Sequence, residues 1–106
     1  MKKLFWAGCC AAVFVSTAAM AGDPEAGKEK SRPCTACHGP DGNSASAQFP
    51  RLAGQHADYL VRALRDYQSG ARKNPIMAPQ AAKLSKRDIA DLAAYFSQQH
   101  GLVDKR

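Results

Sequence analysis

The sequence predicts an all-α protein with three main helices. Three segments, at residues 24–32, 56–69 and 85–99, carry helix-start residues, apolar residues at helical spacing, or both, and each is followed by a residue that ends helices. The alternation of apolar and polar residues that marks β-strands is missing. No internal repeat divides the chain, and its 106 residues suit one domain.

The chain begins with the features of a secretory signal peptide. Lys2 and Lys3 give a positive start, residues 4–15 form an apolar run, and Ala19-Met20-Ala21 matches the small-residue pattern of a cleavage site. We therefore expect a signal peptide over residues 1–21, cleavage after Ala21, and a single domain over residues 22–106 in the periplasm.

Two anchored forms are the alternatives to cleavage. Residues 4–21 carry no charge and reach the lower limit of a membrane span, which would suit an uncleaved anchor. A lipid attached at Cys9 is less favoured, because the apolar run before this cysteine is too short. The position of the small-residue site favours cleavage over both.

The first helix is predicted to begin at Pro24. Asp23 is a good N-cap, Pro24 fits the first helical position, and Glu25 suits the positive end of the helix dipole. We expect this helix to end near Arg32, because Pro33 disfavours helical geometry in the residue before it.

A long loop and a second helix are predicted next. Residues 39–54 are rich in Gly, Pro, Ser and Asn, and so long a loop is unusual in a small domain unless it wraps something. The second helix is predicted from about His56 to Ser69, with Gly70 after its end. Its apolar stripe is Tyr59, Leu60, Ala63, Leu64 and Tyr67.

The last helix has the clearest pattern. Ser85 and Asp88 form a capping box, and the helix is expected to run to Gln98 or Gln99, before Gly101. Its apolar positions follow the helical repeat at Ile89, Leu92, Ala93 and Phe96. Three short helices bury a thin core, and domains this small often need a disulfide, a metal or a cofactor.

The cysteines point to that cofactor. Cleavage would remove Cys9 and Cys10 and leave Cys34 and Cys37, in the run Cys34-Thr35-Ala36-Cys37-His38. This spacing lets two thiols form thioether bonds to one porphyrin, while the adjacent histidine is directed at the iron. We therefore expect one covalently bound haem c, with iron held by His38.

Other uses of the cysteine pair fit less well. A thioredoxin-like dithiol belongs in a βαβ unit, and no strand pattern is present. A structural zinc site needs four ligands, and His56 and His100 lack the spacing of a second pair. A disulfide between Cys34 and Cys37 would give His38 no role.

Met77 is the expected second ligand of the iron. It is the only methionine left after cleavage, and it lies in Asn74-Pro75-Ile76-Met77-Ala78-Pro79, where we expect an extended segment without a helix. A core methionine is the plain alternative. His56 and His100 are the alternative ligands, although both are expected at the surface.

The charge of the expected mature chain restricts its partners. Removing two of the 15 basic residues leaves 13 against 9 acidic residues, a formal charge of about +4 that the haem carboxylates would reduce. This balance favours weak steering toward acidic partners or anionic membrane surfaces. The basic residues are scattered without interleaved aromatics, so no nucleic-acid partner is expected.

The chain resembles the class I c-type cytochromes, most closely the small monohaem cytochrome c-553 type and one half of the dihaem cytochrome c-4 type. The resemblance covers nearly all of residues 22–106. Its motifs are Gly22-Asp23, Ala26-Gly27-Lys28, Cys34 to Gly39, Asp41-Gly42-Asn43, Pro50, Leu52 to Gln55, Tyr59-Leu60, Tyr67, Gly70, Arg72, the Met77 segment, Leu84-Ser85 and Asp88 to Phe96. The chain departs from the pattern at Pro33, which interrupts the first helix, and in having a single haem motif.

The resemblance implies a cytochrome c fold, with three main helices wrapped round the haem. It also implies that the carbonyl group of Pro50 accepts a hydrogen bond from His38, and that Gly27 allows close packing of the first and last helices. Arg51 and Gln55 are expected near the haem carboxylates, with an exposed arginine as the alternative. Tyr59 and Tyr67 are expected in the core.

The expected function is outer-sphere transfer of single electrons. An iron with His38 and Met77 as ligands has no open position, so we expect an electron carrier and no enzyme. Its partners are expected to be redox proteins of a respiratory or similar chain, with transient contact to membrane complexes, and the carrier itself to be a monomer. A haem sensor or weak peroxidase that releases Met77, and a thiol protein without haem, are the alternatives.

Overall fold

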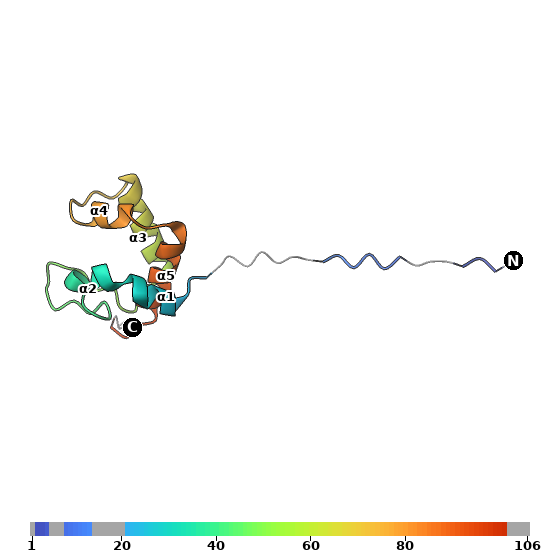
Figure 1. Ribbon diagram of the computed structural model, residues 1–106, viewed down its shortest axis with the longest axis horizontal. Coiled ribbons are helices and arrows are strands. Elements are labelled where there is room, and N and C mark those ends of the chain that lie inside the picture. The colour runs from blue at the N-terminus through green and yellow to red at the C-terminus, as the bar shows by residue number, and fades with distance from the viewer. Residues whose placement is uncertain (1, 5–7, 14–20, 102–106) are drawn as a thin grey trace, which may run out of the picture.

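The computed structural model describes residues 2–4, 8–13 and 21–101, and Figure 1 shows the arrangement of its helices. Over these residues the chain forms five α-helices and no strand, which confirms the predicted all-α class. Three of these helices, the first, third and fifth along the chain, correspond to the predicted main ones. The second and fourth carry residues of the candidate site.

Helix α1 spans Pro24–Lys30 and begins as predicted. The Asp23 carboxylate accepts a hydrogen bond from the Glu25 N–H, and Pro24 occupies the first turn. The helix ends at Lys30, slightly before the expected end near Arg32, and α2 (Arg32–His38) follows directly after Ser31. Pro33 therefore opens a new helix, because the first turn does not need its missing N–H group.

The loop of residues 39–54 is held in place by backbone hydrogen bonds. The Gly42 carbonyl accepts from the N–H groups of Leu52 and Ala53, at 2.8 and 3.3 Å, and the Gly54 N–H donates to the Phe96 carbonyl at 2.9 Å. Gly42 has a φ of +84°, and a Cβ atom at this position would crowd Ala53 and Phe96. The loop is thereby folded against α5.

Helix α3 spans Ala57–Ser69, in agreement with the prediction from about His56 to Ser69. Gly70 follows it in the left-handed conformation, with a φ of +83° that suits a glycine at the end of a helix. The N–H group of Arg72 then donates to the Asp66 carbonyl at 3.0 Å. The chain therefore turns back toward the helix that it has just left.

Helix α4 spans Met77–Ala82, so the prediction of an extended segment around Met77 is wrong. Pro79 lies in the first turn of this helix, where its missing N–H group removes no helical hydrogen bond. The Asn74 Oδ1 atom accepts from the N–H groups of Ile76 and Met77, both at 2.9 Å, and supports the start of the helix.

Helix α5 spans Lys86–Ser97 and begins with the predicted capping box of Ser85 and Asp88. It packs against both α1 and α3. A Cβ atom on Gly27 would overlap the Asp91 carbonyl and the Tyr95 side chain, so glycine permits the close approach of α1 and α5. The core cluster is formed by Leu60, Leu92, Ala93, Tyr95 and Phe96.

The predicted signal peptide lies partly outside the described residues. Residues 2–4 and 8–13 contain no helix, and Cys9 and Cys10 are exposed with free thiols. In the part of the chain that the structure describes, no helix combines the length and the apolar character that a bilayer crossing requires.

Candidate functional site

Helix α2 places two thiols and an imidazole on one of its faces. Cys34 lies one turn before Cys37 and His38, and residues three or four positions apart share a face of an α-helix. Both cysteines are half-buried and free. Burial raises the pKa of the Cys34 thiol above its usual value of 9.0. One short helix therefore brings these groups together without help from distant parts of the chain.

The His38 ring is buried and fixed in orientation. His38 is 6% exposed, and its Nδ1 atom lies 2.8 Å from the carbonyl oxygen of Pro50. A carbonyl oxygen only accepts, so Nδ1 carries the proton and Nε2 keeps a lone pair. This is the hydrogen bond that the family resemblance implied. The edge of the Phe49 ring also contacts the imidazole, with a centroid separation of 6.3 Å.

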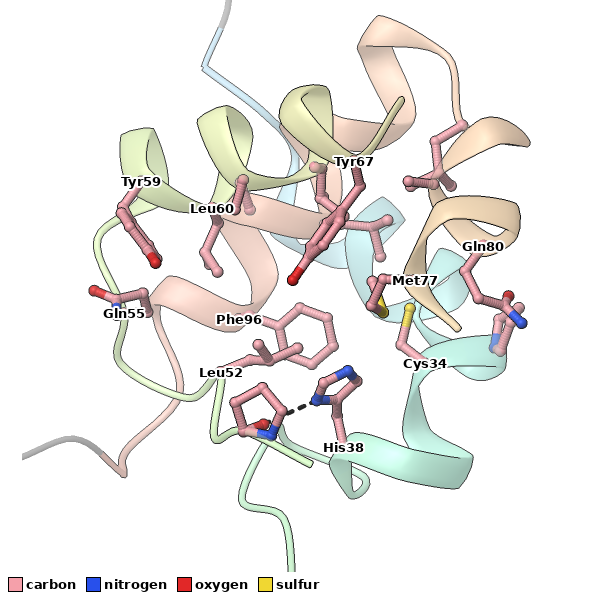
Figure 2. A pocket seen from close by; sticks show the side chains of 18 of the residues that line it. Cys34, His38, Leu52, Gln55, Tyr59, Leu60, Tyr67, Met77, Gln80 and Phe96 are labelled. Carbon is pink, nitrogen blue, oxygen red and sulfur yellow. Dashed lines mark hydrogen bonds between the residues drawn. The ribbon is translucent and has the colours of Figure 1, made fainter. Parts of the chain in front are cut away.

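Met77 reaches the same site from the opposite side. Met77 is the first residue of α4, and its thioether and the His38 ring lie in the same hollow in Figure 2. A thioether is a soft metal ligand, and a neutral imidazole is a common one. Residues 39 positions apart in the sequence thus present two different donor groups to one space.

The space between these groups is a largely apolar cavity of about 280 Å³. A second cavity, also of about 280 Å³, adjoins it and shares His38, Met77 and Cys34. Figure 2 shows side chains that line the first cavity, with α3 above and α2 below the hollow. The apolar walls of this first cavity include Leu52, Leu60, Ala63, Leu64, Leu84, Leu92, Ala93 and Phe96.

These features fit a haem. The cavity has apolar walls for a porphyrin, a thiol at its wall from Cys34, a second thiol from Cys37 in the adjoining cavity, and two donor groups of the kind that hold haem iron. In the described residues, no buried polar side-chain atom lacks a hydrogen-bond partner. The described residues also contain no cluster of three or more His, Cys, Asp or Glu side chains, which leaves no candidate there for a zinc site of that kind.

The remaining predicted residues fall into three pairs. Arg51 and Gln55 line the cavity, but Arg51 is also exposed, so their expected position near the haem carboxylates stays a prediction. His56 and His100 are exposed and line neither cavity. Tyr67 is half-buried and its hydroxyl points into the cavity, whereas Tyr59 is 49% exposed, so the expectation of a core position for Tyr59 is wrong.

A buried ionic cluster that joins α1 to α5 was not predicted from the sequence. Asp91 is 1% exposed, accepts from the Asp23 N–H at 2.8 Å, and binds the Lys30 ammonium at 2.7 Å. Arg87 lies 3.3 Å from the same carboxylate. Hydrogen bonding to Lys30, and then to the Asp23 N–H, holds the pKa of Asp91 below its usual 3.8. Of these partners of Asp91, only Arg87, four residues earlier on the same helix, can be expected from helical spacing.

Arg72 is a second residue whose position was missed. Its guanidinium lies 4.9 Å from the centre of the Tyr67 ring, a favourable cation–π arrangement, and its Nη1 donates to the Tyr59 hydroxyl at 3.4 Å. Arg72 lines both cavities. Its placement depends on the turn after Gly70, so the sequence spacing alone does not reveal it.

Comparisons with known proteins agree with this geometry. The family profile described as cytochrome c matches residues 24–99. Cytochrome c-554(548) of Halomonas halodenitrificans is 46% identical over 82 residues, covering 74% of this chain and 99% of that protein. The thiosulfate dehydrogenase electron acceptor of Stutzerimonas stutzeri is 42% identical over 103 residues, covering 89% of this chain and 47% of that protein.

A solved structure is similar as well. The crystal structure of reduced recombinant cytochrome c4 from Pseudomonas stutzeri matches with a TM-score of 0.74 and 46% identity, covering 78% of this chain and 48% of that chain. The chain spans about half the length, or less, of most of these relatives, the cytochromes c4 among them.

Proposed function

Because the chain belongs to the cytochrome c family, we propose that it is an exported carrier that passes single electrons through a haem ligated by His38 and Met77. The family makes it an electron carrier rather than an enzyme, and its single Cys-x-x-Cys-His motif gives it one covalent haem c. The observation that carries the ligand assignment is the cavity that His38 and Met77 line together.

The residues of the cavity have distinct roles in this proposal. Cys34 and Cys37 hold the haem through thioether bonds from one face of α2. When bound, the haem supplies an iron that gains or loses one electron. His38 offers Nε2 as a ligand, because its hydrogen bond to Pro50 fixes the proton on Nδ1.

The second proposed ligand, Met77, and the cavity walls would determine which small molecules reach the iron. Met77 offers a thioether from α4, and with both donors in place no coordination position stays open for oxygen or peroxide. Leu52, Leu92 and Phe96 keep water away from the centre. A thioether ligand and apolar surroundings both raise a haem reduction potential, which suits a carrier that accepts electrons readily.

We also propose that the protein is exported to the periplasm and that its partners are redox proteins. The apolar segment and the Ala19-Met20-Ala21 site support a cleaved signal peptide and a periplasmic location. A relative of 42% identity is named as an electron acceptor of thiosulfate dehydrogenase, which supports redox proteins as the partners of this chain. The positive charge of residues 22–106 favours an acidic docking surface on such a partner.

Electron exchange with an acidic redox protein tests the function. The reduced protein, loaded with haem, is mixed with the oxidised partner in a stopped-flow instrument, and the reaction is followed at several salt concentrations. We expect second-order exchange of one electron per protein, slowing as salt screens the charges. Slow exchange together with peroxide turnover would instead favour a peroxidase.

A further inference from the structure

We propose that Gln68 is a positioning residue for Met77, because its amide fastens the far end of α4 to α3. The inference deepens the proposed function and rests on it, since it takes Met77 as a ligand of the iron. Gln68 lines neither cavity, and its amide donates to the backbone carbonyls of Ala81 and Leu84, so its effect would pass through the helix that carries Met77.

Helix α4 needs support from outside itself. It has only six residues, and isolated helices of that length are not stable in water. Ala81 is its one buried residue, with a side chain too small to supply much packing. Contacts with neighbouring segments must therefore keep α4, and Met77 at its first position, beside the cavity.

Gln68 supplies such a contact at the end of α4. Its Nε2 atom donates to the Ala81 carbonyl at 2.8 Å and to the Leu84 carbonyl at 2.7 Å. One amide thus joins α3 both to the last turn of α4 and to the segment that leads into α5. The preceding residue, Tyr67, points into the cavity in Figure 2, so α3 contacts the cavity and the support of α4 at adjacent positions.

Asn74 fixes the other end of the same helix. Its Oδ1 accepts from the N–H groups of Ile76 and Met77, both at 2.9 Å. The two amides therefore hold the six-residue helix at its start and at its end. Because Asn74 bonds to Met77 directly, Gln68 is the more informative residue, and any effect of changing it must be transmitted along α4.

The expected consequence is a shift in how often Met77 leaves the iron. Hydrogen bonds that exist only while α4 is docked favour the ligated state, and their loss raises the population with an open position. Gln68 is exposed, so water competes for its donors, and we expect a shift of about three- to tenfold. An added ligand such as imidazole binds only the open state, so its apparent affinity follows this population.

The test compares imidazole affinity in the oxidised, haem-loaded protein. Gln68→Leu and Gln68→Glu keep the approximate size of the side chain and lose the donor, so both should bind imidazole about three- to tenfold more tightly than the parent. Gln68→Lys keeps a donor with similar reach and should stay close to the parent. Gln99→Leu is the matched control, because it removes a hydrogen bond from a glutamine amide to the Tyr95 carbonyl, at the end of α5.

Two further readouts separate positioning from general stability. Amide hydrogen exchange in residues 78–84 should speed up in Gln68→Leu and stay unchanged in Gln99→Leu, and urea unfolding reports the global loss in each variant. Equal effects of the two substitutions on imidazole binding, or an unchanged affinity in Gln68→Leu, would overturn the inference. If the parent lacks methionine ligation in its spectrum, the proposed function fails first, and the inference falls with it.

Discussion

The Nδ1 atom of His38 donates to the carbonyl oxygen of Pro50 across 2.8 Å, and this contact decides which ring nitrogen faces the cavity. The carbonyl is held in turn by the loop that contains it, because Leu52 and Ala53 both donate to the Gly42 carbonyl. The backbone hydrogen bonds of this loop therefore help to orient the His38 side chain on α2. The same loop residues therefore contribute to stability and orient the proposed ligand.

Gly27→Ala should destabilise the protein by about 2 kcal/mol. The added methyl group would meet the Asp91 carbonyl, which is backbone and cannot move aside without shifting α5, and overpacking of this kind typically costs about 1–3 kcal/mol. Urea unfolding followed by circular dichroism measures the change. Lys28→Ala, on the exposed side of the same helix, should change the free energy of unfolding by less than about 0.5 kcal/mol.

Asp91→Asn should lower the free energy of unfolding at neutral pH and make it depend less on pH in the acid range. The pKa of Asp91 is held below 3.8 in the folded protein, chiefly by the Lys30 ammonium. The unfolded chain therefore binds a proton at higher pH than the folded one. The stability that Asp91 contributes is present above about pH 4 and is lost as the pH falls through the lower pKa of the folded protein.

The acid dependence is measured by urea unfolding between pH 7 and pH 3. Glu29→Gln is the control, because Glu29 pairs with Arg32 on the surface, where ion pairs contribute little. Its profile should follow that of the parent. Profiles of Asp91→Asn and the parent that stay parallel down to pH 3 would show that the carboxylate of Asp91 does not link α1 to α5 in the way described.

The sequence predicts the features that local physics determines. The Asp23 cap, the Ser85 and Asp88 capping box and the end of α3 at Gly70 all depend on residues within one turn of each other, and all were predicted correctly. The motif of Cys34, Cys37 and His38 is equally local, since one helical turn brings the groups together.

The features that were missed depend on distant parts of the chain or on the context of a proline. Lys30 and Asp91 are 61 positions apart, and nothing in the local pattern pairs them. The sequence pattern predicts that Pro33 and Pro79 break helices, but each lies in the first turn of a helix, where proline is tolerated. Whether a proline ends or begins a helix depends on residues further along, so the sequence pattern predicts neither α2 nor α4.

The purified protein from the periplasm should begin at Gly22. The Ala19-Met20-Ala21 site places the cut after Ala21. Intact mass spectrometry should give the mass of residues 22–106 plus one haem. A protein recovered from the periplasm that retains residues 1–21 would contradict the proposed cleavage, and recovery in the membrane fraction would favour an anchor.

The double substitution Cys34→Ser and Cys37→Ser should abolish covalent attachment. Both thiols lie on the face of α2 that borders the cavities, and only they offer sulfur for thioether bonds there. In acidified acetone the parent should keep its haem with the protein, whereas the variant should release it. Serine at Cys9 and Cys10 is the control, and it should leave the attachment unchanged.

The central claim is that His38 and Met77 together ligate the iron, and the absorption spectrum of the oxidised protein tests it most directly. The parent should show low-spin bands and a far-red band from the methionine-to-iron bond. Met77→Ala should lose that band, bind added imidazole readily and have a lower reduction potential, while the haem stays attached. His56→Ala and His100→Ala should match the parent. A parent spectrum that survives Met77→Ala but changes with either histidine substitution would contradict the account and indicate two histidine ligands.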